Sequence, residues 1–502
     1  MTELVYLGVD LGAESGRVIA GCWDGRRMRL EELHRFPNGP VAIADTLRWD
    51  ILRLWNEIQT GLAQAGRRFG NAVVSVGVDA WGVDFALLSK SGELLGQPYN
   101  YRDPRTRGMV EQACRRVPRS KIFAATGVQF MEINTLYQLL ALQQNSPELL
   151  AAETLLTIPD YLNWCLSGAR VSELSIAATT QCFNPAKRDW AFELLGRFDL
   201  PARIFPEIVT PGTRIGSLRQ SLADRTGLGT VQVIAPAEHD TGSAVAAVPT
   251  VCTGKANWAY LSSGTWSLLG VEVKEALLSP RALELNMTNE GGVDSTFRLL
   301  KNIMGLWLVQ QCKRAFETRG HSWDYAELVL VAAEAPALRS LVNPNDERFL
   351  NPPDMPAAIQ NYCRETGQPV PETEGALVRC ALESLALKYQ AVIGSLEELT
   401  GQKIEVIHVV GGGSQNNLLN QFTADACNRP VLAGPIEATV LGNVLVQARA
   451  AGEINELADL RAIVRASSDL REFVPDSQTS GAWEEACRRC SELVVRRRGN
   501  SN

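Results

Sequence analysis

The first part of the chain alternates short apolar runs with polar turns that contain glycine. Strand-length apolar runs joined by short turns are typical of antiparallel hairpins. We expect such strands at 4–9, 17–23 and 28–36, with residues 10–16 as the first turn. Apolar residues at helical spacing then predict a helix at 52–67, and the Val-rich run at 72–78 predicts a strand buried on both faces.

An opening of the same kind recurs about half a chain later. An apolar run at 258–261, the sequence SSGT at 262–265 and a second apolar run at 266–270 again give strand, glycine turn and strand. After each hairpin the pattern continues as alternating helices and strands. The economical interpretation is a duplicated α/β domain.

Length and charge narrow the class of protein. A chain of 502 residues is too long for one hydrophobic core, so two large domains are expected. A net charge of −7 provides no long-range attraction to nucleic acids or anionic membranes. The chain has no apolar run long enough to cross a bilayer and no signal-peptide pattern, so we expect a cytoplasmic protein. The 11 scattered cysteines do not form the pattern of a disulfide framework.

The glycines of the first hairpin suggest phosphate binding. The chain has neither a Walker A sequence nor a dinucleotide fingerprint between a strand and a helix. The sequence DLGAESGR at 10–17 instead joins two strands, and its glycines would let backbone N–H groups approach an anion. Asp10 beside this loop could position Mg²⁺ through water. An ordinary hairpin turn is the alternative.

Two glycine loops in the second half add to this interpretation. SSGTW at 262–266 offers hydroxyls and a glycine amide, so two such hairpins could hold a polyphosphate between them. VGGGSQN at 410–416 lies between a strand expected at 404–410 and a helix expected at 416–428. Its glycines would let the backbone lie against a flat ring or a ribose near a helix N-terminus. A plain tight connection is the alternative for each loop.

A carboxylate follows a strand in the sequence PAEHDTGS at 236–243. The apolar strand expected at 231–235 places His239, Asp240 and Thr241 at its end, where α/β proteins build their sites. Asp240 could accept the proton of a hydroxyl that attacks a phosphoryl group. An equal alternative is that Asp240 caps a helix beginning near Gly242.

Two segments of the first half mix aromatic and polar residues in a way that suits a sugar. DAWGVD at 79–84 and YRDPR at 101–105 offer an aromatic ring for stacking and charged groups for hydroxyls. Trp81 could equally belong to the core, and Arg102 and Asp103 could form a surface ion pair.

Together these segments resemble the FGGY carbohydrate kinase family, within the actin-like ATPase superfamily. The resemblance runs from residue 9 to about residue 442, and the ordered set of motifs is specific to the family. It rests on the sequences VDLGAESGR (9–17), GVDAWGVDF (77–85), YRDPRT (101–106), NTLYQL (134–139), EHDTGSAV (238–245), YLSSGTWSL (260–268), TNEGG (288–292), LKNIMGLWLVQ (300–310), NPNDERFLNP (343–352) and VVGGGSQNNLLNQ (409–421).

The resemblance implies an α/β fold of two RNase H-like (actin-like ATPase) domains with an interdomain cleft, and ATP-dependent sugar phosphorylation. It implies that Asp240 is the catalytic base and that Asp10 organises Mg²⁺ through water. For ATP binding it implies Ala13, Glu14, Ser15, Gly16, Arg17, Thr265, Gln310 and Gly412. For ketose binding it implies Gly82, His239, Asp240, Thr241 and Asn302.

From the resemblance we also expect three parts of the chain. These are an N-terminal domain at 1–248 with the sugar site and first phosphate loop, a mainly ATP-binding domain at 249–470, and a C-terminal helix and tail at 471–502. Within the family, the sequences at 260–268 and 300–308 favour phosphorylation of L-rhamnulose at its C1 hydroxyl. A kinase for L-fuculose or another ketose, and a non-catalytic nucleotide or sugar sensor, are the alternatives. The oligomeric state stays open.

The chain departs from the family pattern in its first phosphate loop. Glu14 stands where related loops usually carry Ser or Thr, and a carboxylate would repel phosphate oxygens. We therefore expect its side chain to point away and only its backbone N–H to contribute. Cys363 and Cys380 match positions where related enzymes can form a disulfide; in a reducing compartment we expect free thiols.

Overall fold

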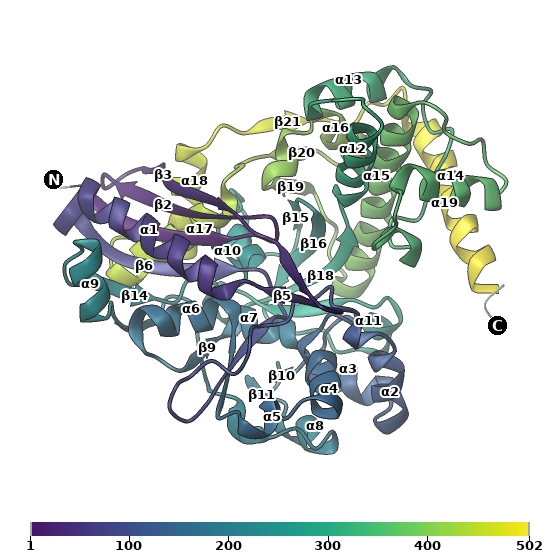
Figure 1. Cartoon of the computed structure of the whole chain (residues 1–502). Coiled ribbons are helices and arrows are strands. Elements are labelled where there is room, and N and C mark those ends of the chain that lie inside the picture. Colours follow the sequence, from purple (N-terminus) through teal and green to yellow (C-terminus); the bar gives the residue numbers. More distant parts are fainter. Residues whose placement is uncertain (1–2, 500–502) are drawn as a thin grey trace. The chain divides into compact units, whose positions relative to one another are not determined.

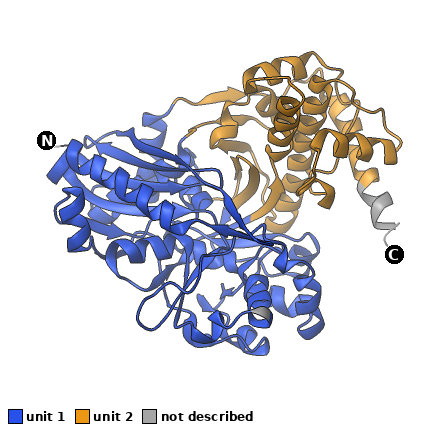
Figure 2. Cartoon of the chain, in the orientation of Figure 1, with its two compact units in different colours: residues 1–254, 272–299, 437–468 blue, residues 255–271, 300–436, 469–502 orange. Residues whose placement is uncertain are grey.

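A computed structural model describes residues 3–499 and divides them into two compact units (Figure 2). Unit 1 comprises the chain up to residue 254 together with 272–299 and 437–468, and unit 2 comprises 255–271, 300–436 and the chain from 469 onward. Neither unit is continuous in sequence. The division expected at 1–248, 249–470 and 471–502 concerns binding roles and stays a prediction. Residues 500–502 of the expected tail lie outside the described residues.

Unit 1 is built on a six-stranded sheet of order β13-β14-β6-β1-β2-β3. Adjacent strands β1, β2 and β3 are antiparallel, whereas β1, β6 and β14 run parallel to one another. The C-terminal ends of these three parallel strands therefore lie in a row at one edge of the sheet. The strands are β1 (Leu4–Leu11), β2 (Ser15–Trp23), β3 (Met28–Pro37), β6 (Val73–Ala80), β13 (Arg214–Ser217) and β14 (Gln232–Ile234).

Helices cover both faces of this sheet, as the purple and yellow-green ribbons show (Figure 1). On one face, Gly61 of α1 (Ile51–Phe69) lies so close to Val18 of β2 that a Cβ there would stand 2.4 Å from it. On the other, a Cβ on Gly21 of β2 would stand 2.8 Å from Val444 of α17 (Ala438–Ala451). Residues three apart in a strand point to opposite faces, so α1 and α17 bury opposite sides of the same strand.

The second sheet has seven strands in the order β17-β18-β16-β15-β19-β20-β21. Strand β15 pairs antiparallel with β16 and parallel with β19, and β19 pairs parallel with β20. This repeats the arrangement of β1 with β2, β6 and β14, which supports the predicted duplication. The strands are β15 (Trp258–Ser263), β16 (Trp266–Val273), β17 (Thr288–Gly291), β18 (Phe297–Met304), β19 (Val406–Val410), β20 (Val431–Ala433) and β21 (Arg471–Phe473).

The long helix α15 (Glu374–Thr400) is the centre of the helical part of unit 2, and most of its apolar side chains are buried. It contacts α12 (Trp307–Thr318), α13 (Tyr325–Glu334), α16 (Asn417–Cys427) and α19 (Ser480–Gly499). Cys380 of α15 and Cys363 of α14 (Met355–Glu365) are buried free thiols, and a hydrogen bond between them lowers the pKa of the Cys363 thiol. Their state in the cell stays a prediction.

Shorter elements complete unit 1. Its further helices are α2 (Met109–Arg116), α3 (Arg119–Thr126), α4 (Thr135–Asn145), α5 (Glu148–Ala151), α6 (Ile158–Ser167), α7 (Leu174–Ala177), α8 (Phe192–Arg197), α9 (Gln220–Thr226), α10 (Asp240–Ala246), α11 (Pro280–Glu284) and α18 (Leu457–Ser467). Two-stranded pairings join β4 (Pro40–Ile43) with β5 (Thr46–Trp49), β7 (Phe85–Leu88) with β8 (Thr154–Thr157), β9 (Val171–Glu173) with β12 (Glu207–Val209), and β10 (Phe183–Asn184) with β11 (Asp189–Trp190).

The predicted strands and helices are all present, with ends that differ by a few residues, but the first turn is shorter than predicted. β1 continues to Leu11 and β2 begins at Ser15, so only residues 12–14 form the turn, closed by the Gly12 N–H bond to Ser15 O (2.8 Å). Gly16 belongs to β2. The Phe36 ring lies where its Cβ would be, at 2.3 Å, so packing explains this glycine. Among the described residues no helix is long and apolar enough to span a bilayer.

Candidate active site

Carboxylates meet where the parallel strands of unit 1 end. Asp10 of β1 and Asp79 of β6 are register partners in adjacent strands. Next to them, Ala80 forms a parallel bridge with His239, and its N–H donates to Glu238 O (2.9 Å). The backbone pairing therefore places Asp10, Asp79 and the segment before Asp240 side by side, as expected for a site at the C-terminal edge of parallel strands.

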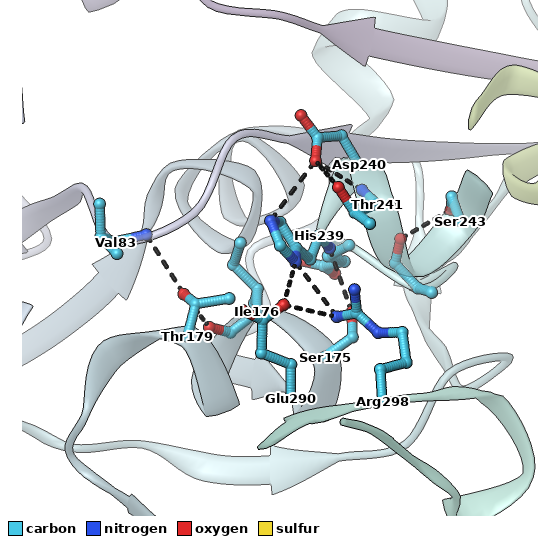
Figure 3. Close-up of polar contacts among 12 residues, drawn as sticks. Val83, Ser175, Ile176, Thr179, His239, Asp240, Thr241, Ser243, Glu290 and Arg298 are labelled. Carbon is cyan, nitrogen blue, oxygen red and sulfur yellow. Dashed lines mark hydrogen bonds and ion pairs between the residues drawn. The ribbon is translucent and has the colours of Figure 1, made fainter. Parts of the chain in front are cut away.

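Asp240 is the first residue of α10, and His239 occupies the N-cap position without a side-chain cap bond. This geometry does not match the alternative in which Asp240 caps a helix that begins near Gly242. The Asp240 Oδ1 atom accepts hydrogen bonds from the backbone N–H and the hydroxyl of Thr241, the latter at 3.1 Å (Figure 3). Desolvation raises the pKa of Asp240 and nearby Asp10 adds to the rise, whereas His239 and Thr241 oppose it. The carboxylate is thus more basic than usual, which suits a proton acceptor.

His239 connects Asp240 to a buried charge pair that sequence reasoning missed. Its Nε2 atom lies 3.4 Å from Asp240 Oδ1, and its Nδ1 atom lies 3.1 Å from Arg298 Nη2 and 3.2 Å from Glu290 Oε2 (Figure 3). Its backbone N–H donates to Ser175 Oγ (3.1 Å). A signal for Arg298 was present in the sequence, because an arginine inside an apolar strand run needs buried acceptors.

Asp10 is paired with Arg17 across the β1–β2 hairpin, and Arg17 also binds Glu437 (2.6 Å) just before α17. The guanidinium of Arg17, a residue predicted to bind ATP, is therefore already ion-paired with two carboxylates. Of the remaining loop residues, Ala13 and Glu14 lie in the turn and Ser15 opens β2. Glu14 is exposed and its carbonyl accepts the Asn38 N–H (2.9 Å).

The residues at the strand ends fit a magnesium ion. Asp79 is fully buried; its Oδ2 accepts from Asn443 Nδ2 (2.6 Å), and its Oδ1 receives no hydrogen bond. Burial raises the pKa of Asp79 well above its usual value, and the charges of Asp10 and Asp240 raise it further. A cation near Asp10 and Asp79 would relieve this repulsion. Mg²⁺ is commonly held by one or two carboxylates with water and phosphate, and among the described residues no three His, Cys, Asp or Glu side chains could hold a metal by themselves.

The expected ketose residue Gly82 lies in a strained turn after β6. A Cβ on Gly82 would stand 3.0 Å from Thr179 Oγ1, and Thr179 is held by the Val83 N–H bond (3.2 Å) and its own bond to Ile176 O (2.8 Å). Val83 has φ of 71°, a region that β-branched residues rarely adopt. Backbone strain of this kind is concentrated at functional sites.

Asp84 organises the aromatic residues behind this turn. Its Oδ2 accepts from Trp49 Nε1 (2.6 Å), Trp81 Nε1 (3.1 Å) and the Tyr101 N–H (3.1 Å), and its Oδ1 accepts from Gln138 Nε2 (2.8 Å). Burial nevertheless raises the pKa of Asp84 to about 6. Trp81 is 6% exposed and packs on Trp49, which favours the core alternative for its ring.

In unit 2, the β15–β16 turn holds the start of α12. Thr265 O accepts the N–H groups of Gly305 (3.1 Å) and Trp307 (3.2 Å), and α12 then presents Gln310 one turn later. The Gln310 Oε1 atom is buried and accepts no hydrogen bond. Buried polar atoms usually have a hydrogen-bond partner, which here could be a ligand donor or a water; the nucleotide role of Thr265 and Gln310 stays a prediction.

The glycine loop after β19 packs on the same turn. A Cβ on Gly413 would stand 2.0 Å from Ser263 Oγ at the end of β15, and Gly411 has φ of 83°. Gly412 differs from both, because its Cβ would meet no atom within 4 Å. Asn302, expected to bind the ketose, lies in β18 within unit 2, where its carbonyl accepts from Asn345 Nδ2 (3.3 Å).

Comparison with known proteins decides the family. Residues 5–247 match the FGGY family of carbohydrate kinases, N-terminal domain, and residues 259–451 match its C-terminal domain. The chain belongs to the FGGY family of carbohydrate kinases. The predicted family is confirmed.

Relatives and solved structures agree with this FGGY assignment. The chain is 46% identical to a rhamnulokinase from Bacteroides thetaiotaomicron, over 96% of this chain and 97% of that protein. It is 44% identical to a rhamnulokinase from Pectobacterium atrosepticum, over 95% of each. The structure resembles a ligand-bound xylulose kinase from Lactobacillus acidophilus (TM-score 0.81, 16% identity, 97% of each chain) and a glycerol kinase from Plasmodium falciparum with ADP (TM-score 0.75, 17% identity, 98% of each chain). The predicted two-domain actin-like fold is confirmed.

In this FGGY kinase the expected site residues fall into two groups. Unit 1 brings together Asp10, Arg17, His239, Asp240 and Thr241, with Gly82 in the turn after β6, and unit 2 brings together Thr265, Gln310 and Gly412. Sequence reasoning suggested sugar contact for the segment 79–84 that includes Asp79, but no metal role for Asp79 and no role for Glu290, Arg298 and Glu437. Pairings such as Arg17 with Glu437 join residues far apart in the chain and have no local signal. The binding roles themselves stay predictions.

Proposed function

We propose that the chain transfers the γ-phosphoryl group of ATP to the C1 hydroxyl of L-rhamnulose. Two rhamnulokinases that match nearly the full length of the chain, at 46% and 44% identity, support the choice of sugar. The observation that carries the chemistry is Asp240, a carboxylate with raised pKa whose Oδ1 is held by Thr241 while its other oxygen is left for a substrate.

In the proposed reaction, Asp240 takes the proton of the C1 hydroxyl as the C1 oxygen attacks the γ-phosphorus. The bond between the γ-phosphorus and the β,γ-bridging oxygen breaks, and that oxygen leaves with ADP. The products are L-rhamnulose 1-phosphate and ADP, with the proton on Asp240 until it passes to solvent. Positioning and electrostatic stabilisation account for most of the acceleration in such transfers.

Gly82, His239, Thr241 and Asn302 are proposed to bind the ketose, and residues 13–17 with Thr265, Gln310 and Gly412 to bind ATP. Asp10 and Asp79 would hold Mg²⁺, which supplies positive charge to the phosphate oxygens. Because Arg17 already binds Asp10 and Glu437, we propose that it acts on ATP mainly by fixing the Asp10 carboxylate. A cytoplasmic location, where ATP is available, is part of the proposal.

The test compares Asp240→Asn with the wild-type chain, using coupled detection of ADP and a panel of ketoses that includes L-fuculose and D-xylulose. A general base contributes roughly 10²- to 10⁴-fold, so we expect turnover of L-rhamnulose to fall by about that factor, with ATP affinity nearly unchanged. Asp199→Asn, at an exposed carboxylate in unit 1, is the matched control. Near-normal turnover in Asp240→Asn would reject the assigned base, and equal use of another ketose would reject the assigned sugar.

A further inference from the structure

A buried ion pair lies behind the proposed base (Figure 3). The Arg298 side chain in β18 is 0% exposed and that of Glu290 in β17 is 5% exposed; Arg298 Nη2 lies 3.2 Å from Glu290 Oε2. Arg298 Nε donates to Gly291 O (2.9 Å). A guanidinium stays protonated in proteins and is costly to bury. A cation held here therefore calls for an explanation beyond packing.

The same Arg298 nitrogen also faces His239. Nη2 carries two hydrogens, and it has two partners: Glu290 Oε2 at 3.2 Å and His239 Nδ1 at 3.1 Å. A ring nitrogen that receives an N–H bond must offer its lone pair, and the proton of a neutral imidazole then sits on the other nitrogen. The position of Arg298 therefore selects the tautomer of His239 with hydrogen on Nε2.

Glu290 could support the opposite tautomer, since its Oε2 also lies 3.2 Å from His239 Nδ1. A hydrogen on Nδ1 would, however, point into the donor group of Arg298, which cannot give up its own hydrogens. With the hydrogen on Nε2, three of the four short contacts pair a donor with an acceptor, the exception being His239 Nδ1 with Glu290 Oε2; with the hydrogen on Nδ1 only two of the four do. Arg298 thus forms an ion pair with Glu290 and donates a hydrogen bond to His239, and this is the arrangement without a clash between donors.

The selected hydrogen matters because His239 Nε2 faces Asp240 Oδ1, at 3.4 Å. Both bonds from Thr241 also end on Oδ1. Within residues 3–499, Oδ2 of Asp240 receives no hydrogen bond, and Figure 3 shows this oxygen pointing away from the other groups. The three donors thus distinguish two carboxylate oxygens that are otherwise equivalent.

We propose that Arg298 is a positioning residue that fixes His239 as the Nε2–H tautomer. His239 and Thr241 then occupy Oδ1 of Asp240, and Oδ2 is the oxygen that takes the sugar proton. The identity of that proton donor rests on the proposed function. The tautomer is a property of the protein alone and can be measured without substrate.

The direct test is nuclear magnetic resonance of the wild-type chain with ring-¹⁵N histidine at pH 8. The chain has only 4 histidines, and the signals of His239 are identified by their loss in His239→Gln. Two-bond ¹⁵N–¹H correlations distinguish Nε2–H, Nδ1–H and doubly protonated rings. We expect the Nε2–H form. The Nδ1–H form or a doubly protonated ring would overturn the proposal.

Arg298 variants then test its role. In Arg298→Met, Glu290 is left as the partner of Nδ1, so we expect the Nδ1–H form to become the major one and kcat to fall about 10- to 100-fold, with the KM for ATP within about twofold. Arg298→Lys keeps a cationic donor and should retain the Nε2–H form. If Arg298→Met does not fold, the double variant Arg298→Met/Glu290→Gln removes both charges and should give mixed tautomers. An unchanged Nε2–H form in Arg298→Met or in the double variant would overturn the proposal.

The matched control is Arg461→Met, which removes another fully buried arginine, one paired with Glu272 (3.1 Å). It should lower stability and leave the His239 signals unchanged. The two proposals can fail separately. A wild-type chain that phosphorylates no ketose but shows the expected tautomers rejects the proposed function and supports the role of Arg298. A chain with full activity and an Nδ1–H ring supports the proposed function and rejects the role of Arg298.

Discussion

Replacing Gly412 by Ala adds a methyl group that meets no protein atom within 4 Å. Gly412 is exposed, opens the short helix η7 (Gly412–Gln415), and does not have a positive φ. Replacing such a glycine stabilises a protein by about 0.4–1 kcal/mol, because the unfolded chain loses conformational freedom. We therefore expect the free energy of unfolding of unit 2 to stay constant or rise by up to about 1 kcal/mol.

The same methyl group would project into the proposed adenosine site. Non-bonded carbon atoms pack about 3.5–4.0 Å apart, so an adenosine lying against Gly412 must shift or lose contacts. We expect the KM for ATP to rise about tenfold, equivalent to about 1.4 kcal/mol of binding free energy. The KM for L-rhamnulose should stay within about twofold. A gain in stability combined with a loss of ATP affinity is a result that general damage to the fold cannot produce.

The assay measures ADP release against ATP concentration at saturating ketose, with urea unfolding of the same samples. Gly413→Ala is the packing control, since its Cβ would stand 2.0 Å from Ser263 Oγ and should lower stability. Gly394→Ala is the neutral control, because this glycine in α15 also has open space and no proposed ligand. An unchanged KM for ATP in Gly412→Ala would remove Gly412 from the adenosine site, and a loss of stability would refute the packing argument.

Two further predictions concern unit 1. In Gly82→Ala the new Cβ would stand 3.0 Å from Thr179 Oγ1, and such overpacking costs about 1–3 kcal/mol. We expect kcat/KM for the ketose to fall by at least tenfold while ATP binding is unchanged. An unaltered KM for the ketose would contradict this. Burial raises the pKa of Glu173 from 4.5 in the unfolded chain to about 7 in the folded chain. Its contribution to stability is therefore complete below pH 4.5 and is lost as the pH rises through 7. The free energy of unfolding should fall by roughly 3 kcal/mol over this range. Urea unfolding between pH 5 and 8 should show a smaller slope in Glu173→Gln, and equal slopes would refute this origin.

Much of the fold was accessible from sequence because its signals are local. The hairpins 4–9/17–23 and 258–261/266–270 were predicted from alternation and glycine, and both are present as β1–β2 and β15–β16. The helix predicted at 52–67 is α1, whose buried residues follow the helical period. Gly16 was misplaced in a turn because close approach of the Phe36 ring, like any tertiary contact, leaves no pattern in neighbouring residues.

The candidate site also combines residues with a local sequence signal and residues whose contacts are remote in the chain. Asp240 and its neighbours were found because a polar cluster after an apolar strand is a local signal. The partners that set their chemistry are remote: Glu437 is 420 positions from Arg17, Asn443 is 364 from Asp79, and Arg298 is 59 from His239. Sequence alone gave these residues no role, and only the folded chain shows that a carboxylate, an amide and a guanidinium contact Arg17, Asp79 and His239.

The buried carboxylates of unit 1 are better explained by chemistry than by stability. Burial raises the pKa of Asp79 and Asp84, and partial desolvation raises the pKa of Asp240, whose side chain is 32% exposed, so each carboxylate loses hydration at neutral pH. Apolar residues of similar size would often be more stabilising. The chain instead surrounds these groups with fixed donors, such as Asn443 for Asp79 and Thr241 for Asp240. Anions held in place before the substrate arrives need no reorganisation during the reaction, and such preorganisation is a main source of catalysis in phosphoryl transfer.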